Sequence, residues 1–160
     1  MIPNYRTARD ARRRGEQGFT LIEVMVVVLI IGILLAVGIP TFLGARTRAQ
    51  DRAAQSNLRT AQTTAFVLMT DVGDFALASS SRMASSEPSL TFFATAASTE
   101  THIVTVAPSS DDTEFGAAVM SDSGTCFFIR LSTSEGPRYG SSTTADCTGV
   151  QALLVTDSSW

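Results

Sequence analysis

Residues 18–40 read GFTLIEVMVVVLIIGILLAVGIP, and Glu23 is the only ionisable residue among them. No side chain between Val24 and Ile39 is charged or strongly polar. A helix of about 20 apolar residues is long enough to cross the hydrocarbon core of a bilayer. We therefore predict a membrane-spanning helix at residues 19–40.

Basic residues precede this apolar segment. Residues 1–18 carry five arginines against Asp10 and Glu16, a net charge of +3, so the rest of the chain carries −6 out of a total of −3. Positive residues beside a membrane segment stay on the cytoplasmic side, which predicts a cytoplasmic N-terminus and an outward-facing C-terminal part. Direct binding to nucleic acid is not expected, because the arginines occupy one short end and the body is acidic.

A secretory signal is one alternative for this N-terminus. Such a signal has an apolar region of about 7 to 15 residues that ends at a small-residue cleavage site. The apolar segment here is longer, and Leu43-Gly44-Ala45 is a poor match to such a site. A simple signal anchor is therefore the better interpretation of the apolar run when it is considered alone.

The junction before the apolar segment changes this interpretation. It reads Arg12-Arg13-Arg14-Gly15-Glu16-Gln17-Gly18-Phe19-Thr20-Leu21-Ile22-Glu23. This stretch resembles the type IV pilin and pseudopilin family, whose signature is a short basic leader ending in glycine, then Phe-Thr-Leu-Ile-Glu and a long apolar helix. The resemblance is specific over residues 12–40. It implies that prepilin peptidase cuts between Gly18 and Phe19 and methylates the new amino group of Phe19.

Glu23 places a carboxylate in an apolar helix, where a charge costs about 2.5 to 3.5 kcal/mol and needs a partner. Cleavage would create an amino group at Phe19, about 6 Å along the helix axis from Glu23. A neighbouring subunit shifted by that distance could pair with Glu23, and the resemblance implies that Thr20 and Glu23 act in filament assembly. The alternative is that Glu23 lies near the lipid headgroups, where the helix dipole favours a carboxylate.

Gly32, Gly38 and Pro40 form a predicted weak point in the helix. Proline removes one backbone hydrogen bond, and glycine weakens the surrounding turns. The resemblance implies that this stretch can lose helical structure in an assembled filament. The alternative, preferred for the isolated precursor, is that Pro40 marks the exit from the membrane and Gly32 permits close helix packing.

An amphipathic helix is predicted at residues 41–70, with its apolar face against a sheet. Its alanines recur at multiples of four, namely Ala45, Ala49, Ala53, Ala61 and Ala65. Asp71-Val72-Gly73-Asp74 should break the helix, and a serine-rich connector at residues 71–89 should lead to a β-rich head at residues 90–160.

Short apolar segments bounded by turn residues predict the strands of the head. These candidate strands are residues 90–96, 102–107, 115–120, 126–131 and 152–156. Residues 134–137 and 139–144 are predicted to be exposed loops. The expected fold class is therefore α+β, with a long N-terminal helix packed on a small antiparallel sheet, as in pilins.

Cys126 and Cys147 both lie in the part of the chain predicted to face outward. An even number of cysteines in an oxidising compartment favours a disulfide, and closing a loop of about 20 residues would contribute about 3 kcal/mol. The pair also resembles the C-terminal disulfide loop of many pilins. The alternatives are two reduced buried thiols, or half of a metal site that lacks neighbouring His or Cys ligands.

No residue pattern in the sequence is typical of an enzyme active site, so neither catalysis nor a cofactor or metal is expected. His102, the only histidine, is interpreted as a packed or surface residue because no nucleophile or acidic motif accompanies it. Four acidic residues resemble the calcium-binding loops of some pseudopilins, but they do not match an EF-hand, and a solvated acidic turn is expected. They are Asp111, Asp112, Glu114 and Asp122.

Three functions fit these features. The preferred one is a pilus subunit, anchored in the cell membrane as a precursor and assembled with identical or related subunits into an extracellular pilus. Its expected partners are prepilin peptidase and the inner-membrane assembly platform. The second is a pseudopilin of a type II secretion or DNA-uptake machine. The third is a single-pass membrane protein that presents a binding domain and never polymerises, and cleavage after Gly18 would separate it from the others.

Overall fold

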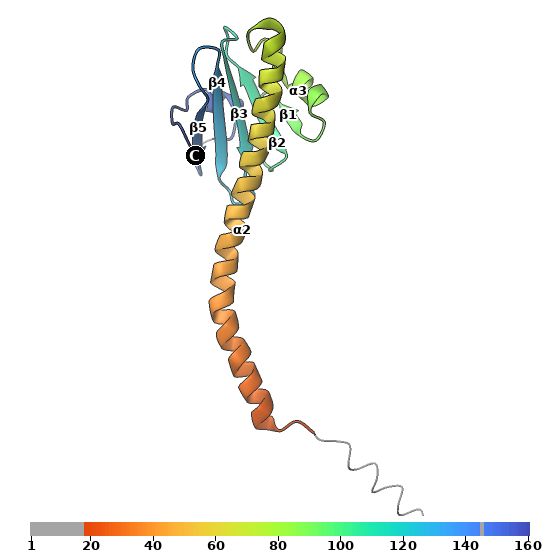
Figure 1. Ribbon diagram of the computed structural model, residues 1–160, viewed down its shortest axis with the longest axis vertical. Coiled ribbons are helices and arrows are strands. Elements are labelled where there is room, and N and C mark those ends of the chain that lie inside the picture. Colours follow the sequence, from red (N-terminus) through yellow and green to blue (C-terminus); the bar gives the residue numbers. More distant parts are fainter. Residues whose placement is uncertain (1–17, 145) are drawn as a thin grey trace, which may run out of the picture. The chain divides into compact units, whose positions relative to one another are not determined.

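The computed structural model describes residues 18–144 and 146–160, so the predicted leader lies outside the described residues except for Gly18. The chain divides into two compact units, Met1–Leu43 and Gly44–Trp160. One helix, α2, runs from Leu21 to Val72 and contributes to both units (Figure 1).

The C-terminal end of α2 is set by a glycine. Gly73 adopts φ 89°, a conformation that glycine reaches without steric cost, and its N–H donates to the Met69 carbonyl at 2.7 Å. The predicted helix break at residues 71–74 is therefore confirmed. The helix itself extends two residues beyond the expected end at residue 70, to Val72.

Pro40 lies inside α2 without ending it. Proline offers no N–H, and its ring crowds the carbonyl four residues earlier. The hydroxyl of the adjacent Thr41 donates to the carbonyl oxygens of Val37 at 3.2 Å and Gly38 at 2.9 Å, which adds hydrogen bonds next to the defect. The helix is continuous here, and its melting in a filament stays a prediction.

Five strands form one sheet in the order β1-β2-β3-β4-β5. Their bounds are β1 Thr91–Phe93, β2 Ile103–Pro108, β3 Glu114–Met120, β4 Cys126–Ser132 and β5 Arg138–Ser142. β1 pairs with β2 in parallel, and the other three neighbouring pairs are antiparallel. The predicted α+β class is confirmed, with the correction that the sheet is mixed at one edge.

The second half of α2 packs on one face of this sheet (Figure 1). Alternate residues of a strand point to the same face, so Phe115, Ala117 and Val119 of β3 all reach the helix. The buried residues on α2 are Ala54, Leu58, Ala61, Thr64, Ala65 and Leu68. Of the predicted alanine stripe only Ala61 and Ala65 are buried, which corrects the expectation for the first three alanines.

Long-range polar contacts fix the position of this half of α2 in the head. The hydroxyls of Ser121 and Ser123 donate to the Asp51 carboxylate, and Asn57 donates to the Thr101 carbonyl at 2.7 Å. The guanidinium of Arg59 lies 5.3 Å from the ring centroid of Trp160. The helix is therefore held by polar and cation–π contacts as well as by apolar burial.

A smaller cluster covers the opposite face of the sheet. It contains the disulfide between Cys126 and Cys147, whose Cα atoms are 5.6 Å apart and which confirms the predicted bridge. The bridge joins the start of β4 to the segment before a short helix, α4, at Gly149–Ala152. Both cysteines are buried, so α4 is tied to the sheet by a shielded covalent link.

Two glycines let α4 lie directly on the sheet backbone. A Cβ added at Gly149 would come within 2.6 Å of backbone atoms of Val106 and Ala107. A Cβ added at Gly116 of β3 would meet the Gly149 carbonyl oxygen. No rotamer change relieves a clash between a Cβ and backbone, so both positions require glycine for packing.

Gly149→Ala is therefore expected to destabilise the head by about 1–3 kcal/mol, the usual range for overpacking a dense site. Urea unfolding can be followed by the fluorescence of Trp160, the single tryptophan, which packs against Phe127 and Tyr139. Gly136→Ala is the matched control, because a Cβ there meets nothing within 4 Å. An unchanged urea midpoint for Gly149→Ala would contradict the described packing.

One element was not foreseen, and two local predictions were wrong. The connector at residues 71–89 contains a helix, α3, at Ser80–Ser86, which buries Met83. Residues 139–144 are largely strand β5, because this segment pairs with β4 although it lacks apolar alternation. Residues 152–156 do not form a strand of the sheet, because the chain turns after α4 and Val155 packs over Gly140.

Candidate functional site

The residues that open α2 form a reciprocal hydrogen-bonded cap. The Thr20 N–H and hydroxyl donate to Glu23 Oε2 at 3.3 and 3.2 Å, and the Glu23 N–H donates to Thr20 Oγ1 at 3.3 Å. This is a capping box, in which two side chains satisfy backbone N–H groups that the first helical turn leaves unpaired. The Thr-x-x-Glu spacing is its sequence signature and was missed in the sequence analysis.

The predicted cleavage site lies just before this cap. Gly18, Phe19 and Thr20 are all outside the helix, and the Phe19 side chain is 83% exposed. A Cβ added at Gly18 would meet no atom within 4 Å. The bond between Gly18 and Phe19 is therefore in open, non-helical backbone.

After the cap, the first half of α2 carries apolar side chains on all of its faces. Large apolar residues from Leu21 to Leu43 are 48–76% exposed, and the most hydropathic 18-residue window of α2 has no buried residue. The helix meets the length and composition required of a membrane span. A helix that is apolar all round needs lipid or other chains to cover it.

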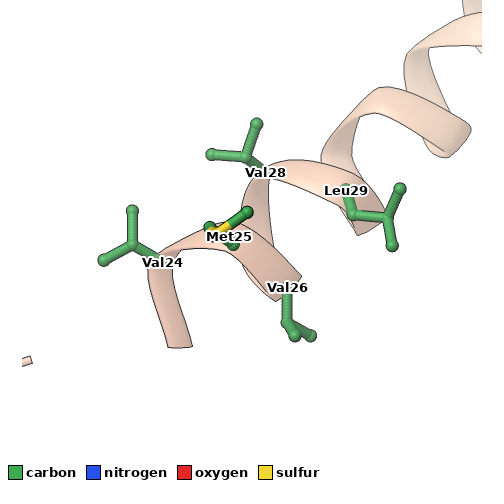
Figure 2. A pocket seen from close by; sticks show the side chains of 5 residues that line it. All are labelled: Val24, Met25, Val26, Val28 and Leu29. Atoms are coloured by element: carbon green, nitrogen blue, oxygen red, sulfur yellow. The ribbon is translucent and has the colours of Figure 1, made fainter. Parts of the chain in front are cut away.

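The open space along the first turns is not a small-molecule pocket. It is lined by Val24, Met25, Val26, Val28 and Leu29. Figure 2 shows these five side chains pointing in different directions from one helix, and all of them belong to α2. A bound small molecule would remain largely exposed there, whereas an adjacent helix or a lipid chain would cover the side chains.

The glycines of the predicted weak point contact no other part of the described structure. A Cβ added at Gly32 or Gly38 would meet nothing within 4 Å. Among the described residues, then, nothing requires glycine at either position. Close contact with another helix and local backbone weakness both remain predictions for these two residues.

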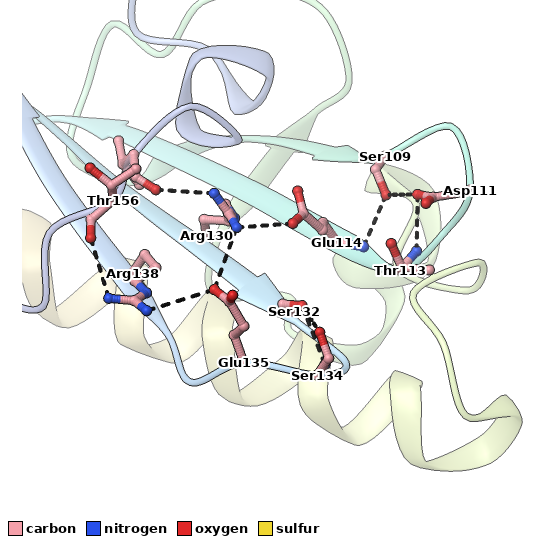
Figure 3. A network of polar contacts seen from close by, with 11 residues as sticks. Ser109, Asp111, Thr113, Glu114, Arg130, Ser132, Ser134, Glu135, Arg138 and Thr156 are labelled. Carbon is pink, nitrogen blue, oxygen red and sulfur yellow. Dashed lines mark hydrogen bonds and ion pairs between the residues drawn. The ribbon is translucent and has the colours of Figure 1, made fainter.

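A separate polar network occupies the head. Figure 3 shows Arg130 of β4 between Glu114 and Glu135, with Nη2 3.0 and 3.6 Å from their carboxylate oxygens. Arg138 also pairs with Glu135 at 3.7 Å. Both arginines donate to backbone carbonyls in the segment after α4, at Val155 and Thr156. The network therefore attaches this segment to the sheet.

The acidic residues singled out in the sequence do not gather at one point. Glu114 pairs with Arg130, whereas Asp111 accepts hydrogen bonds from the Ser109 hydroxyl and the Thr113 N–H, which lower the pKa of Asp111. Within residues 18–144 and 146–160 no group of three or more His, Cys, Asp or Glu side chains could hold a metal. His102 lies on the surface, 3.4 Å from Glu100.

Comparison with known proteins places the site residues in a recognised motif. Residues 13–39 match the prokaryotic N-terminal methylation motif, and this range contains Gly18, Phe19, Thr20 and Glu23. The chain is similar to type IV pilins and type II secretion pseudopilins over part of its length.

Three curated relatives illustrate the breadth of this pilin and pseudopilin family. The type IV major pilin protein PilA of Myxococcus xanthus is 46% identical over 63 residues, which cover 38% of this chain and 29% of the relative. The type IV wide pilus major component PilA4 of Thermus thermophilus is 50% identical over 48 residues, 30% of this chain and 37% of the relative. The type II secretion system core protein G of Aeromonas hydrophila is 40% identical over 47 residues, which cover 29% of this chain and 33% of the relative.

The similarity to these pilins and pseudopilins is confined to part of each chain. The matched stretch spans about a third of the length of the curated relatives. No solved structure gave a significant match. The relatives are structural pilin and pseudopilin proteins rather than enzymes.

Proposed function

We propose that this chain is the precursor of a type IV pilus subunit. Prepilin peptidase cuts it between Gly18 and Phe19 and methylates Phe19, and the mature protein polymerises through the first half of α2. The observation that carries the proposal is a helix apolar on every side, exposed over its whole first half, and headed by a single carboxylate at Glu23. Such a surface needs lipid before assembly and neighbouring subunits afterwards.

The proposal gives each part of the chain a role. Residues 1–18 are the cleaved leader, residues 19–40 the membrane and filament-core segment, and residues 41–70 the amphipathic half that packs on the head. Residues 71–89 connect this helix to the β-rich head at residues 90–160. The assembly platform of the inner membrane would receive the subunit from the bilayer.

Glu23 has two roles in this proposal. In the precursor its Oε2 accepts hydrogen bonds from Thr20. After cleavage it pairs with the new Phe19 amino group of an adjacent subunit, which compensates both charges inside the apolar filament core. Removing one partner of such a pair strongly destabilises the assembly, because the remaining buried charge is left uncompensated.

A pseudopilin of a type II secretion machine is the second candidate, since core protein G of that system is 40% identical over 47 residues. The pilus subunit is favoured because the match to the major pilin is longer, 63 residues against 47. Both candidates use the same cleavage and helix packing. They differ in whether long surface filaments contain this subunit.

The protein recovered from the cell surface is expected to begin at methylated Phe19, which intact-mass and N-terminal analysis would detect. Electron microscopy with antibody against the head should label long filaments for a pilus subunit. If wild-type cells show no such filaments, and cells without this subunit lose protein secretion, the pseudopilin would be favoured. An uncut chain retained in the membrane would instead indicate the non-polymerising membrane protein and overturn the proposal.

A further inference from the structure

We propose that Thr20 is a positioning residue for cleavage of the precursor. Its side chain stops α2 at Leu21 and so keeps the bond between Gly18 and Phe19 outside the helix. This inference rests on the proposed cleavage, and it adds Thr20 to the residues on which that cleavage depends. The role depends on hydrogen bonding at the helix start and is separate from the charge of Glu23.

The backbone hydrogen bonds show how the cap sets the boundary. If α2 continued one turn upstream, the Ile22 N–H would bond to the Gly18 carbonyl and the Glu23 N–H to the Phe19 carbonyl. Instead the Glu23 N–H donates to Thr20 Oγ1, and the Thr20 N–H donates to Glu23 Oε2. The Val24 N–H donates to the Thr20 carbonyl at 3.3 Å and begins the helical series.

The start of α2 at Leu21 needs a specific interaction that prevents the helix from extending upstream. Adding a residue to an existing helix is easy compared with nucleating one, so a 52-residue helix tends to extend into neighbouring residues. Gly18 is itself an acceptable N-cap residue. Without the Thr20 hydroxyl the next cap upstream is therefore Gly18, and its carbonyl then accepts the Ile22 N–H.

If the helix began just after Gly18, the bond between Gly18 and Phe19 would become inaccessible to the peptidase. A peptidase acts on extended backbone, and the Gly18 carbonyl carbon is the atom that must be attacked. In a helix this carbonyl is hydrogen-bonded along the axis and flanked by the first turn. Only the fraction of molecules with a free Gly18–Phe19 segment would then be bound, which raises the apparent KM and leaves kcat unchanged.

Four substitutions separate capping from direct recognition of the threonine. Thr20→Ser and Thr20→Asn retain good capping groups of different shape, whereas Thr20→Ala and Thr20→Val lose the hydroxyl, and valine keeps the shape of threonine. Full-length precursors in detergent micelles would be cleaved by purified prepilin peptidase, with KM and kcat measured separately. The backbone ¹³C chemical shifts of Gly18 and Phe19 would report the helix boundary in each variant.

We expect Thr20→Ala and Thr20→Val to raise KM about five- to tenfold with kcat within about twofold, the range that corresponds to loss of one N-cap. Thr20→Ser and Thr20→Asn should stay within about twofold of the wild type. Helical shifts should reach Gly18 in both variants that lack the hydroxyl.

Three results would overturn this role of Thr20 while leaving the proposed function intact. They are cleavage of Thr20→Ala at the wild-type KM, a KM for Thr20→Asn as high as that for Thr20→Ala, and an unchanged helix boundary in Thr20→Ala. The second would mean that the peptidase reads threonine directly. Failure of the wild-type precursor to be cut after Gly18 would instead overturn the proposed function, and this inference with it.

Discussion

Surface filaments are expected to be absent from cells whose precursor carries Glu23→Gln, while cleavage after Gly18 and membrane insertion continue. Glutamine can replace glutamate in a capping box, so the start of α2 keeps its hydrogen bonds to Thr20. The charge is lost, however, and each Phe19 amino group in the filament core then lacks its partner. Breaking a buried pair in this way costs about 3–5 kcal/mol at every subunit.

Sheared surface filaments and the membrane-retained subunit should be quantified side by side for the wild type, Glu23→Gln and Glu23→Ala. Both variants should accumulate as cut subunits in the membrane, since removing a carboxylate from an apolar helix favours insertion. If Glu23 serves only to cap the helix, Glu23→Gln will assemble like the wild type. Wild-type filament yield from a correctly cut Glu23→Gln strain would therefore refute the assembly role.

Gly18→Val is expected to leave no detectable mature subunit, because a branched side chain occupies the position next to the bond that is cut. A Cβ at Gly18 meets no atom within 4 Å, so the substitution should not disturb the precursor itself. Gly32→Ala is a matched control, since its added Cβ is equally unhindered and lies away from the cut. Intact mass of the membrane protein would show the retained leader in Gly18→Val alone, and normal-sized subunits from this variant would contradict the assigned cleavage site.

The long helix and the central strands were predictable because their sequence signals are local. An uninterrupted apolar run favours one helix from Leu21, and short apolar runs bounded by turn residues favour β3 and β4. β5 was missed because Arg-Tyr-Gly-Ser-Ser contains no run of apolar residues. Its strand structure comes from pairing with β4 on one side and an isolated bridge between Tyr139 and Asp157 on the other.

The alanine stripe on α2 shows how a small error in period changes the buried face. A spacing of four residues exceeds the helical period of 3.6, so each step rotates by about 40° around the axis. Ala45, Ala49 and Ala53 are accordingly exposed, whereas Ala54 begins the buried face. The burial follows steps of three and four, as a straight helix requires.

The residues of the candidate site were recognisable from the sequence, whereas their hydrogen bonding was not foreseen. Gly18, Phe19 and Glu23 were proposed from the motif and lie within the family match at residues 13–39, and their roles stay predictions. The Thr20–Glu23 cap was readable from spacing alone but was not identified. The Arg130 network was not predictable, because its partners at Glu114 and Val155 are brought together only by the folded sheet.

The contacts of α2 with the head have a consequence for the order in which this chain can fold. During synthesis the helix emerges first, yet its partners Thr101, Ser121 and Trp160 are made 44 to about 100 residues later. Non-local contacts of this kind slow folding, because long loops must close before any contact is gained. The face from Ala54 to Leu68 therefore stays uncovered while the strands are still being translated, and the head packs on it only when nearly the whole chain has been made.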